Sequence, residues 1–142
     1  MRVFVDNNII VDALIPNAQF EAEALEILRL LSIKVIEGFV SVNSLTDIFY
    51  VLRKIHGFEK AKQMIKKLFL IFEIVGVEPD DCMSALDSSM SDFEDALISV
   101  CAMKTKADFV VSRDEKFIKA QTEDKVITPK QLLAEINAEI NA

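Results

Sequence analysis

Five short apolar segments alternate with longer segments of helical periodicity along this chain, and few folds accommodate such an order. The short segments, rich in Val, Ile and Phe, predict β-strands. They are Arg2–Val5, Phe39–Val42, Glu73–Val77, Phe109–Ser112 and Val126–Thr128. Strands joined by connections of helix length pair in parallel through right-handed crossovers, with helices on both faces of the sheet. We therefore predict a three-layer α/β/α sandwich around a parallel sheet.

The longer segments repeat apolar residues at the spacing of an amphipathic helix. The predicted helices are Ala18–Leu31, Ser44–Ile55, Glu59–Phe72, Asp80–Ser89, Asp92–Lys106 and Pro129–Ile140. Of the 142 residues 51% are hydrophobic, with three Gly and three Pro, which is typical of a compact, helix-rich protein with a sizeable core. Since no linker or change in composition divides the chain, we predict one domain over residues 1–142.

Neither membrane insertion nor export is expected. No apolar stretch reaches the length of about 18 residues that a transmembrane helix needs. The first predicted strand begins at once and leaves no room for a secretory signal. Cys82 and Cys101 lie far apart without the spacing of a metal or redox motif, so we expect reduced thiols, with one disulfide as the alternative. These features indicate a cytoplasmic protein.

The charge of the chain is acidic overall but unevenly distributed. A net charge of −7, with a pI of about 4.7, argues against binding nucleic acid through a broad basic surface. However, six Lys or Arg residues cluster between Arg53 and Lys67, and they are candidates for phosphate contact as well as ordinary solvated helix faces. A metal site made of carboxylates would also neutralise part of the negative charge. Net charge therefore leaves nucleic-acid binding open.

Four Asp residues are brought to one edge of the predicted sheet. Parallel sheets bind ligands outside the carboxyl ends of their strands. Asp6 and Asp114 follow the first and fourth predicted strands, and Asp47 lies in the first turn of the helix after the second strand. The helix that contains Asp95 ends just before the fourth strand, at the amino edge, so its first turn returns to the carboxyl edge. We therefore expect the four carboxylates to converge.

Converging carboxylates need a counter-charge. Two of them about 5 Å apart repel by roughly 3 kcal/mol at an effective dielectric constant of about 20. A hard divalent cation such as Mg²⁺ or Mn²⁺ removes this repulsion and prefers carboxylate oxygen as a ligand. Asn8 offers a neutral oxygen or orients a water, and Ser112 can hydrogen-bond to a carboxylate from the strand end. The pattern thus predicts a metal site with two supporting polar residues.

Each of these residues also has an ordinary structural explanation. Asp6 suits a turn after a strand, and Asn8 suits a helix cap. Asp47 and Asp114 suit a first helical turn and a loop. Singly these positions carry little information about function, and it is their joint location at one edge that indicates a site.

The acids around Asp95 divide between capping and function. Ser91 and Glu94 match the S-x-x-E capping box, and acids suit a helix N-terminus. We therefore assign Asp92 and Glu94 mainly as cap and helix-dipole residues, with Asp92 as a supporting residue near the metal. Asp95 lies one residue beyond the box, so capping explains it less well.

Four segments of the chain read VFVDNNIIVD, SVNSLTDIFYVLRK, SDFEDALISVCAMKTKADFVVSRDEKF and VITPKQLL. In order and spacing they resemble the PIN-domain family of metal-dependent nucleases. The resemblance covers almost the whole chain, and its most specific part is DFEDALI…ADFVVSRD. The chain looks most like the small single-domain prokaryotic members, many of which are toxins of toxin–antitoxin pairs.

The resemblance implies a five-stranded parallel sheet in the order 3-2-1-4-5. The family's polar positions correspond here to Asp6, Asp95 and Asp114 as metal ligands, Asp47 in the place of a usual Glu, and Asn8 and Ser112 as supporting residues. Asp47 is one methylene shorter than Glu, which implies contact with the metal through water. Asn7 stands where Thr or Ser is more usual. Both departures leave room for reduced activity.

We therefore expect metal-assisted hydrolysis of RNA phosphodiester bonds, catalysed by the four converging Asp residues with Mg²⁺ or Mn²⁺. Arg113 and Lys116 are the expected contacts to the RNA backbone. The expected partners are RNA, an antitoxin protein and a second copy of the chain.

Two other functions fit part of the pattern. A scaffold of the same fold could have lost cleavage and act in protein association. A phosphotransfer protein could form an aspartyl phosphate on Asp6, but it would usually need a second acid nearby and a lysine after a later strand, which this sequence matches less well. A nucleotide-binding enzyme is disfavoured because the chain has no Gly-rich phosphate loop.

Overall fold

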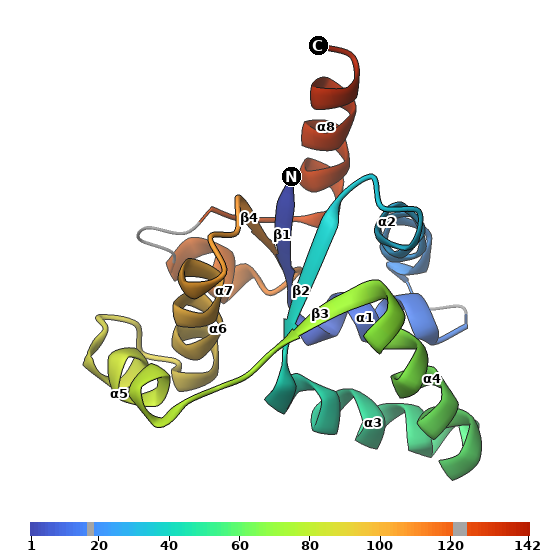
Figure 1. The fold of residues 1–142 in the computed structure, drawn as a ribbon, viewed down its shortest axis with the longest axis horizontal. Helices are drawn as coiled ribbons and strands as arrows, with labels where there is room; N and C mark the ends of the chain where they lie inside the picture. The colour runs from blue at the N-terminus through green and yellow to red at the C-terminus, as the bar shows by residue number, and fades with distance from the viewer. Residues whose placement is uncertain (17–18, 121–124) are drawn as a thin grey trace.

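The sheet contains five parallel strands in the order β3-β2-β1-β4-β5 (Figure 1). The strands are β1 (Arg2–Val5), β2 (Glu37–Ser41), β3 (Phe72–Val75), β4 (Phe109–Val111) and β5 (Val126–Ile127). The computed structural model describes residues 1–16, 19–120 and 125–142. The predicted parallel sheet and its order are confirmed, and the strand ends differ from the predicted ones by at most two residues, the usual uncertainty at such boundaries.

Eight helices lie within the described residues. They are α1 (Asn7–Leu14), α2 (Glu21–Ser32), α3 (Val42–His56), α4 (Phe58–Ile71), α5 (Pro79–Asp87), α6 (Phe93–Lys104), α7 (Glu115–Ala120) and α8 (Pro129–Ile140). The six predicted helices are present, although Ala18, where the first was predicted to begin, lies outside the described residues. The prediction omitted α1 and α7, because helices this short hold too few residues for a periodic apolar pattern.

Helices cover both faces of the sheet, which confirms the three-layer architecture. Along β1 the side chains alternate: Val3 and Val5 pack into the core shared with α1, α2 and α8, whereas Phe4 packs on the other face. Ile98 of α6 and Phe117 of α7 belong to that second core. Figure 1 shows α6 and α7 on one side of the strands and α1 and α2 on the other, with α5 outside α6. Both faces of the central strand are therefore buried, as is typical of parallel sheets.

The described residues bear on the expectations about membrane-spanning helices and about the two cysteines. None of their helices is both long and apolar enough to cross a membrane. Cys82 and Cys101 are free thiols, and Cys101 is fully buried. Burial raises the pKa of the Cys101 thiol to about 11, so it stays protonated and packs as a small apolar side chain.

Close packing of α2 against the sheet requires Gly38 in β2. A Cβ atom added at Gly38 would collide with Leu31 of α2 and approach the Phe72 ring to 3.0 Å. We expect Gly38→Ala to lower the free energy of unfolding by about 1–3 kcal/mol, because extra atoms in a packed core force neighbours out of place. Urea unfolding measures this, with Gly76→Ala as control, since the nearest atom there would be 3.8 Å away. Equal losses in the two variants would contradict the explanation.

Candidate active site

Asp6 and Ser112 follow two neighbouring strands at the carboxyl edge of the sheet. Val5 of β1 pairs with Val111 of β4, so the next residue of each strand emerges at the same level. Ser112 Oγ donates a hydrogen bond of 2.7 Å to Asp6 Oδ2, and both residues are buried, Asp6 with 4% of its surface exposed. Burial raises the pKa of the Asp6 carboxyl, against the lowering effect of the Ser112 hydroxyl. The strand pairing thus holds a carboxylate inside the protein.

Asn8 lies beside this pair and keeps an unused oxygen. Its Nδ2 lies 3.2 Å from Asp6 Oδ2 and 3.4 Å from Ser112 Oγ. Its Oδ1 is buried without a hydrogen-bond partner among the described residues. Because α1 begins at Asn7, with Asp6 at its N-cap position, Asn8 is not the helix cap that was one of the two explanations from the sequence. An unpaired buried oxygen is costly and calls for a ligand or water.

Asp114 reaches the same place from the loop after β4. Its backbone N–H donates to Ser112 Oγ at 3.1 Å, and its Oδ1 accepts a 3.0 Å hydrogen bond from the backbone N–H of Lys116. The charge of Asp114 contributes to raising the pKa of Asp6. Ser112 therefore links the two acids, through the carboxylate of one and the backbone of the other.

Asp92 caps α6, and this corrects the capping box predicted from Ser91 and Glu94. The helix begins at Phe93, and Asp92 accepts a 3.0 Å hydrogen bond from the backbone N–H of Asp95. The sequence S-x-x-E fits the pattern of a box, but the residue that caps is the next one along. Assigning the cap to Asp92 moves Glu94 and Asp95 into the first turn, with their side chains free for other contacts.

The pKa of Asp95 shows how closely the carboxylates gather at this edge. It is 8% exposed, and its pKa is raised to about 7 by burial first, and then by the charges of Asp92, Asp114, Asp6 and Glu94. A carboxyl group that holds a proton near neutral pH is a common feature of functional sites. The predicted return of this helix to the carboxyl edge is thus reflected in the electrostatics.

Glu94 joins the group, although the prediction treated it mainly as a capping residue. Burial raises its pKa, as do the charges of Asp6, Asp47, Asp92 and Asp114. Because its charge acts on Glu94, Asp47 must lie near this group of acids. It lies in the second turn of α3 and not in the first as predicted, because α3 begins at Val42. We call Asp6, Asp47, Asp92, Glu94, Asp95 and Asp114 the acidic rim.

The residue types of the acidic rim suit a divalent cation, although their side chains are not yet arranged around a single ion. The rim's oxygen donors are the ligands that Mg²⁺ and Mn²⁺ prefer. The orphaned Oδ1 of Asn8 can accept a hydrogen bond from a water or bind a cation, and a cation would relieve the repulsion that contributes to the raised pKa of Asp95. Within the described residues, no three His, Cys, Asp or Glu side chains are already arranged to hold one ion. Side-chain movement or bridging waters would complete the coordination, which suits Mg²⁺ because it retains several waters.

A cavity of about 380 Å³ opens beside the rim. Its lining residues are Met90, Ser91, Asp92, Asp95, Asp114, Lys116 and Ala120. Pockets that hold small organic ligands start at roughly 300 Å³, so the space accommodates a group about the size of one nucleotide. Lys116 is among the described residues that line this space, and its predicted contact with RNA stays a prediction.

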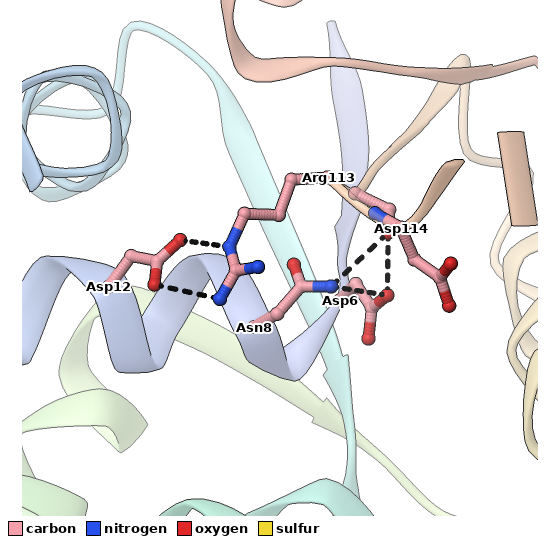
Figure 2. Close-up of polar contacts among 6 residues, drawn as sticks. Asp6, Asn8, Asp12, Arg113 and Asp114 are labelled. Atoms are coloured by element: carbon pink, nitrogen blue, oxygen red, sulfur yellow. Dashed lines mark hydrogen bonds and ion pairs between the residues drawn. The ribbon is translucent and has the colours of Figure 1, made fainter. Parts of the chain in front are cut away.

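Arg113, the other predicted RNA contact, has a partner inside the protein. Its Nε lies 2.6 Å from Asp12 Oδ2 and its Nη2 3.2 Å from Asp12 Oδ1 (Figure 2). Its Cζ lies 5.1 Å from the Phe20 ring centroid. The Asp12 side chain is 7% exposed, and that of Arg113 is 40% exposed. The pair ties α1 to the loop that carries Asp114. Sequence reasoning missed this link, because Asp12 looks like any polar residue on a short helix.

Removing Arg113 is expected to destabilise the protein. Arg113→Ala would leave Asp12 buried and unpaired, and breaking a fully buried pair costs about 3–5 kcal/mol. Since Arg113 is partly exposed, we expect a loss of about 2–3 kcal/mol in the free energy of unfolding. Denaturant unfolding of Arg113→Ala and of the double variant Arg113→Ala/Asp12→Asn tests this, since the second change removes the stranded charge. A double variant no more stable than the single one would contradict the explanation.

Comparisons with known proteins agree with this fold. Residues 2–116 match the PIN domain. Ribonuclease VapC1 of Aquifex aeolicus (strain VF5) is 30% identical over 121 residues, covering 82% of this chain and 83% of that protein. The crystal structure of Mycobacterium tuberculosis VapC20, a sarcin-ricin loop cleaving toxin, matches with a TM-score of 0.66 and 18% identity, covering 83% of this chain and 94% of that one. VapBC2 of Rickettsia felis, bound to a DNA fragment from its promoter, also gives 0.66, at 17% identity, covering 90% and 98%.

Proposed function

The chain belongs to the PIN domain family, and from this we propose that it is an endoribonuclease whose acidic rim binds a divalent cation and hydrolyses RNA phosphodiester bonds. The observation that supports it most is the gathering of six acids from four parts of the chain beside a cavity of nucleotide size, with the pKa of Asp95 raised to about 7. Structural stability alone does not explain such a gathering, because like charges at short distance are unfavourable.

In this proposal Asp6, Asp95 and Asp114 hold Mg²⁺ or Mn²⁺ at the carboxyl edge. When bound, the ion supplies positive charge opposite the scissile phosphate and makes water more acidic near neutral pH. Ser112 and Asn8 fix the orientation of the Asp6 carboxylate through their hydrogen bonds to Oδ2. The unpaired Asn8 oxygen is available to a water of the ion's shell.

The remaining acids would act at longer range. Asp92 holds the first turn of α6 and thereby the position of Asp95. Asp47 lies close enough to Glu94 for its charge to contribute to raising the pKa of Glu94, and both carboxylates are suited to accept hydrogen bonds from waters around the ion. Glu94 adds the longer carboxylate side chain that Asp47 lacks. We propose that these two acids together serve the position for which a single Glu was expected.

The biological role we propose is that of the toxin in a toxin–antitoxin pair. VapC1 is named a ribonuclease, VapC20 a toxin that cleaves the sarcin-ricin loop, and VapBC2 of Rickettsia felis is a complex bound to its promoter DNA. By analogy this chain would act on RNA in the cytoplasm and be held inactive by an antitoxin protein. A second copy of the chain is a further candidate partner.

The decisive experiment is cleavage of a mixed pool of structured and single-stranded RNA by the purified protein, with Mg²⁺, with Mn²⁺ and with EDTA. Cleavage with either cation and none with EDTA is the expected result. Equal cleavage in EDTA would exclude the proposed metal dependence. Lack of cleavage in every condition, together with a melting temperature that still rises with Mn²⁺, would favour a scaffold that binds metal without cutting.

A further inference from the structure

The helical hairpin formed by α3 and α4 differs in charge from the rest of the chain. Residues 42–71, which we call the basic hairpin, contain six Lys or Arg and two acids, whereas the whole chain has a net charge of −7. Within the part of the chain that the structure describes, the four ion pairs involve none of these six cations. Their charge is therefore available to an external anion.

Exposed aromatic rings lie among these cations. Tyr50 is 61% exposed, and Lys54 Nζ lies 4.3 Å from its ring centroid. Phe58 is 49% exposed, with Arg53 Cζ at 5.7 Å and Lys62 Nζ at 5.3 Å from its centroid. Single-stranded RNA is bound by this combination, because the cations meet its phosphates and the rings stack on its unpaired bases.

Helix α3 joins this surface to the acidic rim. It begins directly after β2 at the carboxyl edge and runs away from the sheet (Figure 1). Asp47, Tyr50 and Lys54 are exposed and spaced three and four residues apart, so they share one face. The helix rises about 10 Å from Asp47 to Lys54, which about three stacked nucleotides cover at ~3.4 Å each. A strand cut at the rim can therefore continue along this face.

The helix dipole does not explain the charge of the basic hairpin. Arg53 and Lys54 lie in the last turn of α3, where cations are favourable. Lys60, however, lies in the first turn of α4, which begins at Phe58, and cations are unfavourable at that end. Lys62 lies one turn further along, where the dipole has little effect. A role in binding accounts for the cations of both helices together.

We propose that the basic hairpin binds the part of a single-stranded RNA that flanks the scissile phosphate. Lys54 and Lys62 contact its phosphates, and Tyr50 and Phe58 stack on its bases. This inference rests on the proposed ribonuclease function, since it assumes that RNA is the substrate. It adds a binding surface outside the acidic rim and assigns the protein a preference for unpaired RNA.

The test compares three full-length variants with the wild type by the affinity for a fluorescent 20-nucleotide single-stranded RNA in EDTA, where cleavage is suppressed. We expect Lys54→Gln/Lys62→Gln to weaken binding about tenfold and to lower the slope of log affinity against log salt by about 1.4, or roughly 0.7 per lost phosphate contact. Tyr50→Ala should weaken binding about fivefold or more, with the salt slope unchanged. The control Lys106→Gln/Lys125→Gln removes the same charge just before β4 and β5, at the amino edge, and should change affinity by less than about twofold.

Cleavage of a 20-mer and of a tetranucleotide separates the two proposals. Loss of kcat/KM in Lys54→Gln/Lys62→Gln should be several times larger for the 20-mer, because the tetranucleotide reaches little beyond the rim.

If the wild type cleaves both but this variant binds and cleaves like the control, the hairpin proposal is wrong and the ribonuclease stands. If the variant changes the oligomeric state without changing RNA affinity, the surface binds protein instead, and the proposal is equally wrong. Should the wild type bind the RNA but cleave nothing in Mg²⁺ or Mn²⁺, the ribonuclease proposal fails by itself.

Discussion

Asp95→Asn is expected to reduce RNA cleavage by about a hundredfold or more while the protein stays folded. A divalent cation contributes several kcal/mol of stabilisation to the transition state, and each 1.4 kcal/mol corresponds to about tenfold in rate. Asn keeps the shape of Asp95 but removes one of the three charges proposed to hold the ion. Its backbone N–H still donates to Asp92, so the start of α6 is preserved. Cleavage rates at saturating Mg²⁺ measure the effect.

The matched control for that variant is Asp87→Asn, which removes one carboxylate from the exposed end of α5. It should leave the cleavage rate within about twofold of the wild type, since surface substitutions away from a site have small effects. An Asp95→Asn protein that cuts as fast as the control would remove Asp95 from the proposed metal site. Recovery of its activity at higher Mn²⁺ would instead support weakened ion binding as the cause.

The stability of the metal-free protein is expected to fall as pH rises from about 4 to about 7. The pKa of Asp95 is raised from 3.8 to about 7 in the folded protein, so over this range the folded state holds a proton that the unfolded chain releases. Because the folded state binds more protons, the free energy of unfolding decreases with pH. A shift of this size corresponds to about 4 kcal/mol without screening, and we expect roughly half of it in solution.

Two comparisons isolate this contribution. In EDTA, the stability difference between Asp95→Asn and the wild type should grow in favour of the variant by about 2 kcal/mol between pH 4 and pH 7.5 and then level off. Adding Mg²⁺ or Mn²⁺ at pH 7.5 should stabilise the wild type more than the variant, because the cation binds the ionised form. Urea unfolding across this pH range measures both. If the free energy of unfolding depends on pH in the same way for the wild type and for Asp95→Asn, the pKa of Asp95 is not raised and the explanation is wrong.

The relation between sequence and fold is clearest at the strands. Apolar runs such as VFV in β1 identified the strands, and the helix-length connections fixed their parallel direction, because both follow from local patterns and chain length. The spatial order of the strands came from the resemblance to a family. Local patterns do not contain that order, since any of several orders would satisfy the same hydrophobic faces.

For the candidate site too, part was determined by the sequence and part by the packing of the sheet. The sequence by itself determined that Asp6, Asp47, Asp95 and Asp114 end at the carboxyl edge, because a residue just after a parallel strand, or in the first turns of a helix there, must lie at that edge. The proximity of Asp6 to Asp114, and the burial of Asp6 beside Ser112, depended on the register of β1 against β4. That register is a long-range property of the packed sheet.

Only the tertiary structure decided three further features. The cap of α6 falls on Asp92, which turns Glu94 into a member of the acidic rim, and one residue of difference in a helix start is beyond the resolution of a sequence pattern. Arg113 pairs with Asp12, 101 residues away along the chain. The amide oxygen of Asn8 is left buried and unpaired. Local sequence sets which side chains are available, whereas burial and pairing are set by neighbours that the fold brings from distant parts of the chain.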